Sequence, residues 1–223
     1  MQSIATESMQ EIAPSNTKRN PLIESLSLFA YFALLLGCTG LAIHADVILL
    51  HGTVQDNSVI ESLQDVYLLT SCLLFITVAV RQPRQRGFAV LVGGFFAVLL
   101  IRELDGVLDY VYHGFWKVPA LIVSGYAIWF AYKHKQDTLN DLARYLQHPT
   151  FSLMLGGMAS LLIFSRIFGM SELWQALMGD NYIHSVKNLA EEGVELLSYT
   201  LIVFAAGWYT LPQLFRKAPT DIH

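Results

Sequence analysis

The chain has 223 residues, of which 54% are hydrophobic and only 14% are charged, and its formal net charge is −4. A soluble domain usually carries about 25% charged residues, so this chain is short of the ions that cover a water-exposed surface. The small negative charge gives no reason to expect a nucleic-acid partner. Both cysteines, Cys38 and Cys72, lie within apolar runs, where a thiol is expected as a small packing residue rather than in a disulfide.

Apolar segments of about 20 residues separate the charged residues, and a helix of this length crosses about 30 Å of hydrocarbon. Residues 1–23 are polar and predict a loose cytoplasmic tail, and residues 212–223 predict a second one. Because unpaired strand edges cannot face lipid, the predicted fold class is all-α, a polytopic bundle of about six transmembrane helices in the lipid bilayer. Within residues 24–211 the helices are expected at Ser25–His44, Val59–Val80, Phe88–Tyr110, Trp116–Tyr132, Phe151–Met170 and Tyr182–Thr210.

Lysine and arginine are unevenly distributed between the loops, and this distribution predicts the orientation in the membrane. Ten of the 14 basic residues flank the predicted helices on one side: Lys18, Arg19, Arg81, Arg84, Arg86, Lys133, Lys135, Arg144, Arg216 and Lys217. Positively charged loops stay in the cytoplasm, so both termini are expected there and the number of spans is expected to be even. We therefore expect a multi-pass protein of a cell inner membrane.

The loop between the fourth and fifth predicted helices has a helical pattern of its own, at about residues 137–147. Apolar residues recur on one helical face, which predicts an amphipathic helix on the inner leaflet. These residues are Leu139, Leu142, Ala143 and Leu146. Thr138 with Asp141 three residues later resembles a capping box and predicts that the helix begins there.

Two of the apolar segments resemble each other. Residues 88–106 align without gaps on residues 151–169 and share a Phe, a Gly-Gly pair, one Leu and a final Gly. This similarity predicts a duplicated helical hairpin, which is a common way to build a membrane protein. The Gly-Gly pairs independently predict close contacts between helices.

Ionisable residues gather at the outer ends of four predicted helices, whereas the inner halves are apolar. Fourteen apolar residues precede Arg102 in the third helix, so Arg102 is expected about 21–23 Å from the inner boundary, and Arg166 at a similar depth. One stripe of the third helix is expected to carry Arg102, Asp105, Asp109 and His113. This stripe is expected to face a stripe of polar and ionisable residues on the sixth helix. The predicted outward-facing polar pocket comprises Glu61, Asp65, Arg102, Glu103, Asp105, Asp109, Arg166, Asn188, Glu191, Glu192 and Glu195.

Three interpretations of this pocket involve no metal. In the favoured one, its carboxylates bind and release protons or ions, as in ion- or proton-linked transport or channel activity. A chain of this length would then be expected to form a homo-oligomer or to bind a membrane partner subunit. In the second, the protein is a non-catalytic subunit or assembly factor of a membrane complex. In the third, Arg102 and Arg166 pair with Glu103, Asp105 or Glu195 only to hold the bundle together.

The fourth interpretation is a membrane-embedded, metal-dependent hydrolase that acts on a lipid. Its candidate ligands are Asp109, His113, His184, Glu191 and Glu195. Oxygen and nitrogen ligands of this kind suit zinc, iron or manganese, and a metal-bound water would attack the lipid headgroup. The sequence has no HExxH motif, so it leaves open whether the protein is an enzyme.

Overall fold

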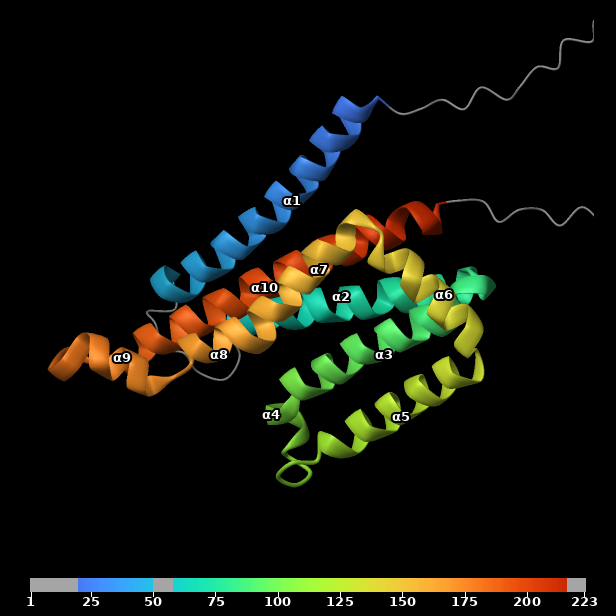
Figure 1. Cartoon of the computed structure of the whole chain (residues 1–223). Coiled ribbons are helices and arrows are strands. Elements are labelled where there is room, and N and C mark those ends of the chain that lie inside the picture. Colours follow the sequence, from blue (N-terminus) through green and yellow to red (C-terminus); the bar gives the residue numbers. More distant parts are fainter. Residues whose placement is uncertain (1–19, 50–57, 216–223) are drawn as a thin grey trace, which may run out of the picture.

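The predicted apolar segments fold as helices in the computed structural model of the chain, which describes residues 20–49 and 58–215. These residues form helices and turns and contain no strand (Figure 1). The α-helices in chain order are α1 (Pro21–His44), α2 (Val59–Arg81), α3 (Arg86–Glu103), α4 (Asp105–Leu108), α5 (Lys117–Lys133), α6 (Lys135–Leu146), α7 (Pro149–Ala159), α8 (Ser165–Phe168), α9 (Ser171–Met178) and α10 (His184–Leu214). The all-α fold class is therefore confirmed.

Five helical segments are long and apolar enough to cross a membrane. They are α1 with its continuation to Ile48, α2, α3 with the turn before it, the run from α7 to α8, and α10. The other predicted span corresponds to α5, which has 17 residues and so stands at the lower limit of length for a transmembrane helix. The chain is thus a polytopic bundle in which α5 packs beside α3.

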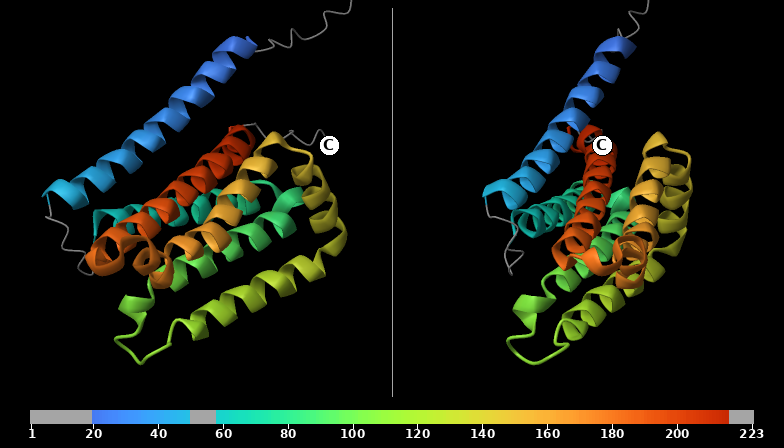
Figure 2. Two further views of the ribbon diagram at one scale, coloured as in Figure 1. Left: turned by 60° about the vertical axis from the view of Figure 1, so that its left-hand side comes forward. Right: turned by 90° about the vertical axis from the view of Figure 1, so that its left-hand side faces the viewer.

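Helices α2 and α10 lie side by side at the centre of the bundle (Figures 1 and 2). On the far side of α2 come α3 and then α5, whereas α7 and α8 cover α10. Helix α1 contacts α10 and α2, but little of its apolar stretch is buried, and its first half diverges from α10 (Figure 1). We call the end of the bundle with α6 and the turn between α2 and α3 the inner end, and the end with α4 and α9 the outer end.

The Gly-Gly pairs do bring helices close together. A Cβ atom at Gly93 would lie 3.3 Å from Ile76 of α2, and a Cβ atom at Gly157 would lie 3.0 Å from Ile202 of α10. The predicted close contacts are therefore confirmed at these two glycines. The duplicated hairpin itself stays a prediction.

The third predicted helix is shorter than expected. Helix α3 ends at Glu103, because Leu104 leaves the helical conformation with φ −81° and ψ 16°, and α4 is a separate turn. The prediction that Arg102, Asp105, Asp109 and His113 share one helical stripe is therefore wrong. The sequence also did not predict α9, which occupies part of the expected loop after α8.

The amphipathic helix exists as α6, but it starts and faces differently from the prediction. It begins at Lys135, so Thr138 is an interior residue whose hydroxyl donates to the Ala131 carbonyl, 3.3 Å away, and the predicted capping box is wrong. Thr138, Asp141 and Tyr145 are buried, whereas Leu139 and Leu146 are exposed. The face turned to the protein therefore carries Thr138 and Asp141 beside Tyr145, with Leu142 partly buried against the core, and Leu139 and Leu146 remain exposed.

A wide turn interrupts the helix that runs from α7 to α8. Residues Ser160–Phe164 form a π-helical turn, and the Ser165 amide bonds to the Ser160 carbonyl five residues earlier. The predicted tails lie mostly outside the described residues: α1 already begins at Pro21, α10 continues to Leu214, and residues 1–19 and 216–223 are not described.

Candidate functional site

Capping groups hold the outer end of α2 in place. Ser58 and Glu61 form a capping box, in which the Ser58 hydroxyl accepts from the Glu61 amide at 3.0 Å and the Glu61 carboxylate accepts from the Ser58 amide at 3.3 Å. The buried Asp46 carboxylate accepts from the amides of Val59 and Ile60, both at 2.9 Å. Acidic groups are favourable at a helix N-terminus. This arrangement fixes where the first turns of α2 present their carboxylates.

A cavity of about 460 Å³ lies between α2 and the end of α3 with α4. We call it the acidic pocket, because carboxylates at four positions line it and none of the described residues lining it is Lys or Arg. Asp65 lies near both Glu61 and Glu103. The lining residues are Glu61, Ser62, Gln64, Asp65, Glu103, Leu104, Asp105, Gly106, Val107 and Tyr110. The pocket therefore concentrates negative charge at the outer end of the bundle.

A second group of charged residues lies between α8 and α10, and we call it the ion-pair cluster. Arg166 is 3.3 Å from Glu195 and 4.0 Å from Glu191, and Lys187 is 3.1 Å from Glu191. A Cβ atom at Gly169 would overlap the Glu191 carboxylate, so a side chain there would displace the end of Glu191. Two cations thus balance two carboxylates in this cluster.

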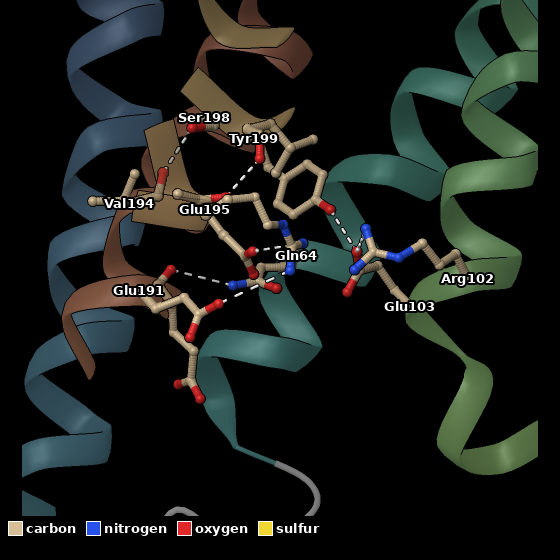
Figure 3. A network of polar contacts seen from close by, with 12 residues as sticks. Gln64, Arg102, Glu103, Glu191, Val194, Glu195, Ser198 and Tyr199 are labelled. Atoms are coloured by element: carbon tan, nitrogen blue, oxygen red, sulfur yellow. Dashed lines mark hydrogen bonds and ion pairs between the residues drawn. The ribbon is translucent and has the colours of Figure 1, made fainter. Parts of the chain in front are cut away.

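Hydrogen bonds connect α10 to the helices around the acidic pocket (Figure 3). The Tyr199 side chain is only 1% exposed, and its hydroxyl donates to Glu103 Oε1 at 2.8 Å. Arg102 lies 3.7 Å from the same oxygen. Gln64, which is 3% exposed, donates from Nε2 to the Glu192 carbonyl at 3.3 Å. Glu103 is therefore shared between the acidic pocket and α10.

The structure divides the predicted polar pocket into three parts. Glu61, Asp65, Glu103 and Asp105 line the acidic pocket, with Arg102 beside Glu103. Arg166, Glu191 and Glu195 belong to the ion-pair cluster. On the same stretch of α10, Asn188 and Glu192 are half-buried, and the Glu192 carboxylate lies near those of Glu61 and Asp46. Asp109 is elsewhere, in the turn after α4.

The residues predicted as metal ligands are not brought together. Asp109 pairs with His113 at 2.9 Å, and His184 lies 3.2 Å from the Tyr182 hydroxyl. Glu191 and Glu195 face Arg166 instead. Within residues 20–49 and 58–215, no group of three or more His, Cys, Asp or Glu residues is arranged to hold a metal ion.

Sequence reasoning missed three residues that organise this region: Asp46, Gln64 and Tyr199. For two of them the helical spacing in the sequence could have indicated the role. Gln64 is three residues after Glu61, and Tyr199 is four residues after Glu195, so each shares a helical face with a predicted pocket residue. Asp46 had none, because its capping role depends on how closely the residues after α1 lie to the start of α2.

Comparison of the chain with protein-family models, with curated proteins and with solved structures finds no match. The function is therefore argued from the geometry and charge of the described residues.

Proposed function

We propose that the protein carries protons or small cations across a membrane, with the acidic pocket as the site that they enter from the outer side. The observation that carries this proposal is the unequal charge of the two neighbouring groups. In the ion-pair cluster Arg166 and Lys187 match Glu191 and Glu195. In the acidic pocket Arg102 pairs with Glu103, whereas the charged groups of the described residues that lie near Asp65 are the carboxylates of Glu103 and Glu61.

This difference separates a structural role from a binding role. Holding α8 and α10 together is a sufficient role for ion pairs whose charges balance. Carboxylates that lie at membrane depth without matching cations cost free energy unless they are hydrated, protonated or bound to a cation. Among residues 20–49 and 58–215, Asp65 is in that position, close to Glu61 and Glu103 and paired with no cation. An aqueous pocket that takes up protons or cations explains why Asp65 lies beside two other carboxylates.

Apolar side chains close the pocket on its inner side. Leu68 follows Asp65 by three residues and is fully buried, and Leu99 precedes Glu103 by four residues and is also buried. Below them the Phe75 and Phe96 rings pack with centroids 5.9 Å apart. We propose that this layer is the closed gate. Because one chain of this size offers few helices for a complete pathway, we also propose that it works as a homo-oligomer or with a membrane partner subunit.

The test is ion flux into lipid vesicles that contain the purified full-length protein. Proton, sodium and potassium gradients are applied in turn, and the flux is followed with dyes trapped inside the vesicles. We expect faster flux than in empty vesicles for at least one of these ions. Asp65→Asn and Glu103→Gln should each reduce the flux to the level of empty vesicles, because the pocket loses charge without losing volume.

The matched control is Glu172→Gln, because Glu172 is exposed on α9 and lies outside both charged groups. It should leave the flux unchanged. A wild-type protein that conducts none of the three ions would contradict the proposal, and so would folded Asp65→Asn and Glu103→Gln variants that conduct as well as the wild type.

A further inference from the structure

Helix α3 forms the floor of an apolar groove whose two walls are α2 and α5. It packs against both of these helices and lies between them (Figure 1). The groove has a volume of about 600 Å³. We call it the α3 groove, and it is lined by α3 between Arg86 and Ala97, by Ile76 and Val80 of α2, and by Tyr126 and Phe130 of α5.

Small residues of α3 leave the floor of the groove free while the walls stay close. Gly93 approaches α2, as described above, and a Cβ atom at Gly94 would lie only 2.6 Å from that of Ala127 in α5. Ile76 and Val80 line the groove and are 43% and 69% exposed. The groove therefore opens on the outside of the bundle, where a transmembrane protein meets hydrocarbon.

The length of the groove corresponds to one membrane leaflet. Arg86 and Ala97 are its limits on α3, and at 1.5 Å per residue they lie about 16 Å apart along the helix axis. The hydrocarbon core of a bilayer is about 30 Å thick, so each leaflet supplies about 15 Å. Because the groove starts at the inner end of the bundle, it spans the leaflet on that side. A lipid acyl chain fits this length, whereas a transmembrane helix would extend well beyond it.

A positive charge stands at the inner end of this apolar groove. Of the described residues that line it, Arg86 alone is charged, and its side chain is exposed. Its Nε donates to the Ala79 carbonyl at 3.0 Å, which holds the guanidinium beside the end of α2. That bond uses one of the five N–H donors of the side chain. Among residues 20–49 and 58–215, no carboxylate forms an ion pair with Arg86.

We propose that the α3 groove binds an anionic phospholipid, with one acyl chain along α3 and the phosphate on Arg86. The planar guanidinium suits bidentate binding of a phosphate. Basic residues between transmembrane helices, at the level of the headgroups, are typical of sites for anionic lipids. A neutral lipid would leave the positive charge of Arg86 unmatched. The bound lipid contacts both walls, so it also joins α5 to α2 across α3.

The test is native mass spectrometry of the purified full-length protein in a neutral detergent. Phosphatidylglycerol or phosphatidylcholine with the same acyl chains is added in increasing amounts, and a Kd is obtained for each lipid. A basic residue near the headgroups contributes about 1 kcal/mol to the binding of an anionic lipid, which is about fivefold in Kd. We therefore expect phosphatidylglycerol to bind at least about fivefold more tightly than phosphatidylcholine.

Two variants test the two parts of the site separately. Arg86→Gln should raise the Kd of phosphatidylglycerol about fivefold and bring it near that of phosphatidylcholine, because only the charge is lost. Ala97→Leu should weaken both lipids alike, because the larger side chain fills the floor of the groove. Thermal unfolding of each variant shows that it is folded.

Arg84→Gln and Ala33→Leu are the matched controls, because both residues are exposed and neither lines the groove. They should leave the Kd values nearly unchanged. Equal Kd values for the two lipids would overturn the proposal. So would an Arg84→Gln variant that weakens phosphatidylglycerol as much as Arg86→Gln, since general surface charge would then explain the preference. Lipid-free dimers that Ala97→Leu abolishes would instead assign the groove to a second copy of the chain. None of these results depends on ion flux through the acidic pocket.

Discussion

Tyr199 is a buried residue whose polar atom connects α10 to the outer end of α3. Its hydroxyl reaches from α10 to Glu103 at the end of α3, while its ring fills the core. A hydrogen bond to a charged group inside a protein contributes more than one between neutral groups. The Tyr199 phenol, together with Arg102, therefore orients Glu103 and so helps to shape the acidic pocket.

We expect Tyr199→Phe to lower the free energy of unfolding by about 1.5–3 kcal/mol, because the change removes only the donor to Glu103. Denaturant-induced unfolding in detergent measures this. Tyr126→Phe, at an exposed position of α5, is the control and should have little effect. If Tyr199→Phe costs as much in a Glu103→Leu background, which has no acceptor, as in the wild type, the hydrogen bond does not account for the loss.

The close contact between α7 and α10 depends on one residue of a glycine pair, Gly157. Gly157 faces α10, where an added Cβ atom would lie 3.0 Å from Ile202 and 3.2 Å from Leu201, whereas nothing lies within 4 Å of one at Gly156. Gly156 and Gly157 are adjacent and chemically identical, yet only Gly157 lies at the contact with α10.

We expect Gly157→Ala to destabilise the protein by about 1–3 kcal/mol, because the methyl group forces α7 and α10 apart. Gly156→Ala is the matched control and should be neutral or stabilising, since alanine favours the helix over glycine. Thermal unfolding of the two variants side by side measures the difference. Equal destabilisation would show that the α7–α10 contact is not the cause.

At the scale of the whole molecule, the described basic loops lie at the same end of the bundle as α6 (Figure 1). The expected orientation places this inner end in the cytoplasm. Labelling of single cysteines in intact cells tests it, in a background where Cys38 and Cys72 are replaced. An impermeant maleimide should label Asp180→Cys directly and Gln136→Cys only after the cells are permeabilised. The reverse pattern would contradict the orientation.

Helix positions could be predicted from the sequence better than helix contacts. The expected second span, Val59–Val80, differs from α2 by one residue, because apolar length is a property of the segment itself. The break at Leu104 and the buried polar face of α6 depend on packing against other helices. The Arg166–Glu195 pair, which one interpretation of the sequence expected, is confirmed at 3.3 Å. The additional contact of Arg166 with Glu191 was not expected, since spacing along one helix does not identify the residues opposite.

The π-helical turn at Ser160–Phe164 determines which way Arg166 points. Such a turn holds one residue more than an α-helical turn, and one residue corresponds to a rotation of about 100° around the helix axis. In a chain one residue shorter at this turn, the arginine side chain would project toward another part of the helix circumference, away from Glu195. A single inserted codon is therefore enough to create or abolish the ion-pair cluster, without any change in the residues that form it.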